Sequence, residues 1–269
     1  MDQHGVTSVL RPRARDELVG LDGRDGLLAG GTSLMSDPNP SLRRLVDLTT
    51  LDWPALVVAD DGLEIAATCT IERLITAEYP AHWRAAPLFE QSAHTLLASY
   101  KIWHTATVGG NICLGLPAGA MISMCSALDA ELLVWHADGT DSVHRTADIV
   151  IGNAQTSLAT GDVLRSIRFP AAVLTQRTAL RKASYAHLGR SGAVVIARRT
   201  PIGVVVSVTA ATRRPYVLEV ATSDPDVVAQ QVLSAIPTDG FHTDAHGTAP
   251  WRMSVTEYLV ADAVAEVTS

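Results

Sequence analysis

The fold is decided by the stretch Leu28-Ala29-Gly30-Gly31-Thr32-Ser33-Leu34 and its counterpart Ala106-Thr107-Val108-Gly109-Gly110-Asn111. Each contains paired glycines followed by a small hydroxyl or amide residue. Paired glycines allow backbone conformations closed to other residues and let another group approach closely. Successive N–H groups in such a turn can form an anion-binding concavity. Two such loops indicate a ligand with two polar stretches, such as a dinucleotide, although paired glycines also mark ordinary turns.

Composition limits the classes of protein that fit this chain. Its 269 residues, 47% of them apolar, are enough for one large domain or two modest ones with a real core. The net charge of −7 argues against nucleic acid or an anionic membrane surface as a partner. A pyrophosphate still fits an acidic protein when backbone N–H groups supply the field.

The cysteines and the N-terminal stretch bear on the cellular compartment. The spacing of Cys69, Cys113 and Cys125 matches no zinc or iron–sulfur pattern. An odd number of scattered thiols favours a reducing cytoplasm over a secreted disulfide scaffold. We expect no signal peptide and no membrane-spanning segment, because the N-terminal residues lack an apolar run and the longest apolar stretch is short.

Hydrophobic patterning predicts α/β subdomains followed by a different, α+β region. We expect strands at 27–29 and 45–48, a hairpin joining 56–59 to 63–67, and helices at 70–78, 80–99 and 120–128. Strands are expected at 131–135 and 166–169, with a domain boundary at 171–177. Beyond it, three strands (179–184, 193–197, 203–210) precede two helices (225–236, 250–265).

No familiar catalytic constellation is evident in the sequence. The G-x-G-x-x-G fingerprint, a P-loop lysine and a nucleophile elbow are all missing. His242 and His246 lie four residues apart, but their neighbours are typical of a loop, so we predict no metal site. No acid–base pair or activated nucleophile stands out, which is typical of a protein whose chemistry belongs to a bound cofactor.

The two stretches resemble, in order, the two FAD-binding signatures of molybdenum hydroxylase flavoproteins. These are the medium, FAD-binding subunits of the carbon monoxide dehydrogenase and xanthine dehydrogenase group. The resemblance extends to Arg44–Leu48, Leu128–Leu132, Gly161–Pro170 and Leu180–Ser184, and therefore covers nearly the whole chain.

The resemblance implies a fold and a set of cofactor contacts. It implies an FAD-binding domain of the PCMH type over residues 1–172, with subdomains of about 1–55 and 56–172, then a C-terminal α+β domain over 173–269 with a three-stranded antiparallel sheet. The first loop would hold the pyrophosphate, and the second would follow the ribityl chain and the flavin. Leu158 and either Arg181 or Lys182 correspond to residues beside the ring. The implied FAD contacts are Leu28, Ala29, Gly30, Gly31, Thr32, Ser33, Leu34, Ala106, Thr107, Gly109, Gly110, Asn111, Ala120, Leu158, Arg181 and Lys182.

The implied function is that of one subunit of a cytoplasmic heterotrimeric oxidoreductase. In that family, a large subunit hydroxylates substrate at a molybdenum cofactor. A small subunit passes electrons through [2Fe–2S] clusters to FAD, which delivers them to an external acceptor. We therefore expect no catalytic side chain and no metal ligand in the present chain, and we expect the molybdenum and iron–sulfur centres on its partners.

Ala120 departs from the family pattern and leaves alternatives open. Family members carry an aspartate thirteen residues after the first threonine of the second signature, where it binds the ribityl hydroxyls; here alanine stands at that position. A non-catalytic scaffold subunit with weakened or lost FAD binding is one alternative. A stand-alone flavin oxidase of the vanillyl-alcohol-oxidase type is another, although the C-terminal region is small for a substrate domain.

Overall fold

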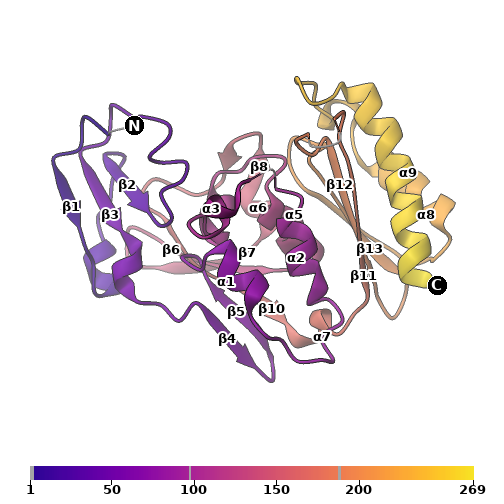
Figure 1. Cartoon of the computed structure of the whole chain (residues 1–269), viewed down its shortest axis with the longest axis horizontal. Coiled ribbons are helices and arrows are strands. Elements are labelled where there is room, and N and C mark those ends of the chain that lie inside the picture. The colour runs from indigo at the N-terminus through magenta and orange to yellow at the C-terminus, as the bar shows by residue number, and fades with distance from the viewer. Residues whose placement is uncertain (1–2, 97, 187–188) are drawn as a thin grey trace.

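The computed structural model describes residues 3–96, 98–186 and 189–269. Three larger sheets follow one another across the described part of the chain, with the N-terminal sheet at one end and the C-terminal helices at the other (Figure 1). The strands are β1 (Ser8–Leu10), β2 (Asp25–Leu28), β3 (Arg44–Asp47), β4 (Leu56–Ala59), β5 (Gly62–Ala66), β6 (Glu131–Trp135), β7 (Asp141–Arg145), β8 (Val150–Gly152), β9 (Gln155–Thr156), β10 (Val163–Pro170), β11 (Thr178–Ala183), β12 (Ala193–Arg199), β13 (Val204–Thr209) and β14 (Tyr216–Val220). Strands β8 and β9 form a further, two-stranded sheet. The α-helices are α1 (Ile71–Thr76), α2 (Pro87–Ala93), α3 (Tyr100–Trp103), α4 (Val108–Cys113), α5 (Ala120–Ala127), α6 (Thr146–Ile149), α7 (Ala171–Leu174), α8 (Pro225–Ala235) and α9 (Ala249–Thr268).

The N-terminal sheet has three parallel strands in the order β1-β3-β2. Its central strand carries Val46, which is fully buried in a small core with Leu18, Leu21 and Leu48. The first glycine stretch leaves this sheet directly after β2. The strands expected at 27–29 and 45–48 are therefore present, shifted by one or two residues.

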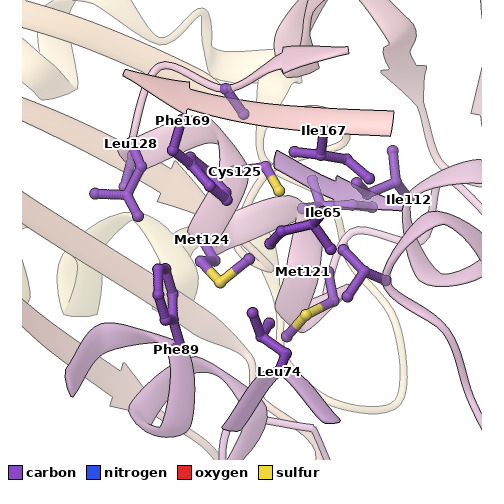
Figure 2. Close-up of a cluster of buried hydrophobic side chains, with 14 of the residues drawn as sticks. Ile65, Leu74, Phe89, Ile112, Met121, Met124, Cys125, Leu128, Ile167 and Phe169 are labelled. Carbon is purple, nitrogen blue, oxygen red and sulfur yellow. The ribbon is translucent and has the colours of Figure 1, made fainter. Parts of the chain in front are cut away.

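The second sheet is antiparallel, in the order β4-β5-β10-β6-β7. One face packs against α1, α2, α4 and α5, and Figure 2 shows Ile65, Ile167 and Phe169 of the sheet meeting Met121 and Met124 of α5. All residues of α5 are buried, because the side of α5 away from this sheet meets β12 and β13. The helix expected at 80–99 is much shorter: α2 spans only Pro87–Ala93, and its N-terminal part is replaced by turns around Pro80 and Trp83.

The C-terminal sheet has four antiparallel strands, β11-β12-β13-β14, and not three. The additional strand, Tyr216–Val220, pairs with β13 from Val204↔Val220 to Val208↔Tyr216. Hydrophobic patterning does not indicate this strand, because it is short and directly follows Arg213-Arg214-Pro215. Helices α8 and α9 cover one face of this sheet, as Figure 1 shows.

The two faces of the C-terminal sheet belong to different cores because strand side chains alternate. Val194 and Ile196 of β12 pack with α5, whereas Val195 and Ala197 pack with α9. Among the described helices, none is both long and apolar enough to cross a membrane.

Arg198 of β12 joins the C-terminal sheet to the end of α5. Its side chain is almost fully buried, and its Nε donates a hydrogen bond to the Ala127 carbonyl at 2.8 Å. The guanidinium also donates to the Asp129 carboxylate and the Gln176 amide oxygen. Burial lowers the pKa of Arg198, while the Asp129 carboxylate acts in the opposite direction.

Candidate functional site

The first glycine stretch forms an open turn after β2. Gly31 has φ of +69°, a left-handed conformation that residues with a Cβ rarely adopt. The turn is closed by hydrogen bonds from Met35 N–H to the Gly31 carbonyl (2.9 Å) and from Ser36 N–H to the Ser33 carbonyl (2.8 Å). The N–H groups of Gly30 to Leu34 have no acceptor among the described residues, so this row of donors remains available.

Gly30 lies where the first stretch touches the segment that leads into the second. A Cβ on Gly30 would overlap the Thr105 carbonyl oxygen and lie 2.8 Å from the carbonyl carbon. The two backbones therefore approach more closely than any other residue would permit. This contact fixes the distance between the two stretches.

The second stretch is the first turn of helix α4 and not a loop. Thr107 caps this helix, and its hydroxyl accepts a hydrogen bond from Gly110 N–H at 3.1 Å. The N–H groups of Val108 and Gly109 donate to the carbonyls of Cys69 (2.9 Å) and Ala67 (3.0 Å). The N–H groups of Val108, Gly109 and Gly110 are therefore used within the protein, and the anion-binding donors expected here are found only in the first stretch.

Gly109 is required for packing. A Cβ at this position would overlap the Ala67 methyl group and lie 2.7 Å from the Ala67 carbonyl oxygen. Helix α4 consequently lies directly against the chain that leaves β5.

A cavity of about 650 Å³ opens between the two stretches. Its floor and walls come from the turn after β2, from the segment containing α3, and from α4 with the residues that follow it. Asp37 is the only formally charged residue among the described residues that line it. The lining residues are Leu27, Ala29, Gly30, Gly31, Thr32, Ser33, Leu34, Asp37, Asn39, Leu96, Ala98, Ser99, Ile102, Ala106, Thr107, Gly110, Asn111, Cys113, Leu114 and Leu116.

The cavity brings together most of the residues predicted from the two stretches. Those that line it are Ala29, Gly30, Gly31, Thr32, Ser33, Leu34, Ala106, Thr107, Gly110 and Asn111. Leu28 and Gly109 belong to the same stretches but do not line it: Leu28 lies beneath the turn against Gly31, and Gly109 faces Ala67.

Ala120 and Leu158 lie outside the lining of this cavity. Ala120 is the first residue of α5 and is 0% exposed within the main core. Next to it, Met121 N–H donates to the Asn111 side-chain oxygen at 3.0 Å, which links α5 to α4. Leu158 follows β9 and packs against the edge of the same core. Direct contact of the Ala120 side chain with a ligand would require a local rearrangement.

Arg181 and Lys182 point to opposite faces of β11. The Arg181 guanidinium pairs with Asp262 and Glu266 of α9, and the hydrogen bond to Asp262 raises its pKa. Lys182 is exposed and lies on the side of α2, with its Nζ 3.4 Å from the His94 carbonyl. Of these two predicted contacts, only Lys182 faces the layer that contains the cavity.

Sequence reasoning missed the lining residues that tertiary packing brings in. Leu96, Ala98, Ser99 and Ile102 come from the segment around α3, which carries no motif. Asp37 and Asn39 belong to the stretch Asp37-Pro38-Asn39-Pro40, whose residue types favour a turn but indicate no ligand. Cys113, an exposed free cysteine, also lines the cavity.

These features fit a dinucleotide bound through its pyrophosphate. The cavity volume lies within the usual range of about 300–1,000 Å³ for ligand sites. The row of unpaired N–H groups from Gly30 to Leu34 matches an anionic group, and the lining hydroxyl and amide side chains can bind sugar hydroxyls.

Comparison with known proteins identifies the family. Residues 6–172, more than half of the chain, match the family model of the FAD binding domain in molybdopterin dehydrogenase. The chain belongs to this family. FAD is therefore the cofactor of this protein, and the protein is a component of an oxidoreductase. No curated protein matches this member of the family.

Solved structures show the same fold over nearly the whole chain. Cu,Mo-CO dehydrogenase in its cyanide-inactivated form matches with a TM-score of 0.82 and 21% identity, covering 98% of each chain. Reconstituted CO dehydrogenase from Oligotropha carboxidovorans matches with a TM-score of 0.81 and 20% identity, covering 97% of this chain and 96% of that one. Quinoline 2-oxidoreductase from Pseudomonas putida 86 matches with a TM-score of 0.81 and 16% identity, with the same coverage.

Proposed function

We propose that this flavoprotein is the electron-transfer subunit of a multi-chain, molybdenum-dependent oxidoreductase. The row of unpaired N–H groups from Gly30 to Leu34 along the cavity carries the proposal, because it supplies a pyrophosphate site within a family defined by FAD. FAD, when bound, accepts electrons singly and releases them in pairs. The partners would be a large subunit with the molybdenum cofactor and a small subunit with [2Fe–2S] clusters, in the cytoplasm.

The residues of this chain would orient FAD and set the charge around it. The N–H groups of Gly30 to Leu34 would hold the pyrophosphate, and the hydroxyls of Thr32 and Ser33 would add donors. Asn111 lines the cavity through α4 but already accepts from Met121 N–H, so its amide group is held in one orientation. Lys182 is the better placed of the two basic candidates, because Arg181 is already neutralised by Asp262 and Glu266.

Reconstitution tests this proposal. The purified chain should show flavin absorbance and should oxidise no aldehyde or purine alone. Co-expression with its molybdenum and iron–sulfur partners should give a complex that reduces an external acceptor, and this turnover should disappear when FAD is removed. If the lone polypeptide oxidises such a substrate, the subunit proposal is wrong and a stand-alone oxidase replaces it.

A scaffold subunit without productive FAD binding is the second candidate. It is favoured by specific observations: the first N–H groups of α4 are used internally, the cavity lining carries no described cation, and Ala120 offers no carboxylate. A colourless protein that takes up no added FAD, yet still assembles with its partners, would support this candidate over the first.

A further inference from the structure

A hydrogen-bonded chain of four side chains lies at the end of the five-stranded sheet, away from the FAD cavity. His136 Nδ1 is 2.9 Å from the Asp162 carboxylate, and His136 Nε2 is 2.7 Å from Ser142 Oγ. Ser142 Oγ is in turn 2.6 Å from His144 Nε2. None of these residues lines the FAD cavity.

The sheet register brings these residues together. Val163 of β10 pairs with Trp135 of β6, so Asp162 and His136, which adjoin those residues, lie side by side. Val134 pairs with Ser142 and Leu132 with His144, so both β7 side chains lie on one face of the hairpin. The residues are scattered in the sequence, which explains why no nucleophile was evident there.

Asp162 determines the direction of the hydrogen bonds. Its side chain is only 6% exposed, and its second oxygen accepts from Ala159 N–H at 2.9 Å, so the carboxylate is fixed. A carboxylate beside Nδ1 keeps the proton on that nitrogen, which leaves His136 Nε2 as an acceptor. The Ser142 hydroxyl then donates to His136, and Ser142 Oγ accepts from His144. This is the nucleophile, base and orienting acid arrangement of serine hydrolases.

Solvent reaches this group of residues, and a backbone N–H that can bind a negatively charged oxygen lies nearby. The His136 side chain is 29% exposed, and Ser142 is half-buried on the edge strand β7. His136 N–H donates to the Thr140 carbonyl at 2.9 Å, which sets the alternation of ladder bonds in this hairpin. In this alternation the N–H of Val143, the residue after Ser142, points away from β6 toward the unpaired edge of β7. It can therefore donate a hydrogen bond to a negatively charged oxygen there.

We propose that Ser142 and His136, oriented by Asp162, form a second, hydrolytic site that acts on small carboxylic esters. Ser142 Oγ attacks the ester carbonyl carbon, and the hydroxyl proton passes to His136 Nε2. The ester C–O bond then breaks, and the departing alcohol takes that proton. Water, deprotonated by His136, cleaves the acyl group from Ser142 and restores the hydroxyl. No oxidant or reductant is consumed.

Labelling of the FAD-loaded full chain with diisopropyl fluorophosphate tests the nucleophile. Ser142 Oγ would form a bond to phosphorus as fluoride leaves, and mass spectrometry would place the adduct on the Ser142 peptide. Ser142→Ala should abolish this labelling. Ser157→Ala is the matched control, because its hydroxyl donates to the Asp148 carbonyl and forms no hydrogen bond with a histidine among the described residues; its labelling rate should be unchanged. An unlabelled Ser142 in the unmodified protein would overturn the proposal.

Substitution of each histidine in turn shows which of His136 and His144 acts as the general base. His136→Gln should slow labelling by at least about a hundredfold, the usual contribution of a general base, whereas His144→Gln should leave the rate within about threefold. His136→Ala should recover labelling when imidazole is added. The opposite ranking of the two glutamine variants would refute the assignment of His136 as the base. Flavin absorbance reports that each variant remains folded.

Asp162 is a positioning residue, and its test needs a readout beyond rate. Asp162→Asn should slow p-nitrophenyl acetate hydrolysis at least about tenfold. It should also move the His136 proton from Nδ1 to Nε2, which the nitrogen chemical shifts of the ring report. A slowed reaction with an unchanged tautomer would contradict the positioning role.

Discussion

A comparison of Gly31→Val with Gly20→Val distinguishes an effect on FAD binding from an effect on protein stability. Both glycines have left-handed backbones, with φ of +69° and +77°. A Cβ at Gly20 would meet no atom within 4 Å, whereas one at Gly31 would lie 3.0 Å from Leu28 Cδ1. Of the two, only Gly31 lines the cavity proposed for FAD. The two variants therefore share the backbone strain but differ in their position relative to the cofactor.

The expected magnitudes follow from these conformations. A left-handed backbone costs a residue with a Cβ about 1–2 kcal/mol, so both variants should lose a similar amount of stability. If residue 31 relaxes to a negative φ, the adjoining peptide planes turn and their N–H groups leave the pyrophosphate row. Two lost hydrogen bonds to a charged group, at about 1.5–3 kcal/mol each, correspond to at least a hundredfold increase in the FAD dissociation constant.

Flavin content, FAD titration of the apo-protein and thermal melts measure these effects together. Gly31→Val should be folded but colourless, and Gly20→Val should be slightly less stable but yellow. Normal flavin content in Gly31→Val would refute the assignment of the first stretch. Equal flavin loss in both variants would show that strain alone, and not the site, controls retention.

Three further outcomes are expected. Ala120→Asp should lower the melting temperature and leave FAD affinity unchanged, because an unpaired carboxylate would enter a buried position; tighter FAD binding would instead place residue 120 beside the ribityl chain. Arg198→Ala should lower the free energy of unfolding by about 1–3 kcal/mol, measured by urea denaturation, because the Ala127 carbonyl and Asp129 lose their donor; an unchanged midpoint would contradict this. Gly109→Ala should destabilise by about 1–3 kcal/mol, since its methyl group would overlap Ala67; a melt like that of the unmodified protein would show that α4 can shift.

Local chemistry made much of the lining of the candidate site predictable. Paired glycines beside small polar residues indicate that another group can approach the backbone closely. Ten residues of the two stretches line the cavity. Sequence alone did not show that Gly109 and Gly110 lie in a helix, because glycine disfavours helices. Here the Thr107 cap and packing against Ala67 outweigh that preference.

The features that sequence reasoning missed depend on contacts between distant segments. Ile102 reaches the cavity only because α3 is folded across it, and β14 is defined by its pairing with β13. The register of the β6–β7 hairpin brings the Ser142 hydroxyl to His136, and no recognisable sequence motif marks this pair. Such constellations become visible only when the sheet is assembled.

The nearly uncharged lining of the cavity proposed for FAD determines how FAD affinity should depend on ionic strength. Dissolved salt weakens attractions between exposed opposite charges, but a pyrophosphate held by backbone dipoles involves no cationic side chain. FAD affinity should therefore change little between dilute buffer and concentrated salt. Because Asp37 is the lone formal charge in the described lining and repels phosphate, any residual trend should favour binding as salt is added. Unlike a site built from arginine and lysine, this one should keep its flavin through high-salt purification.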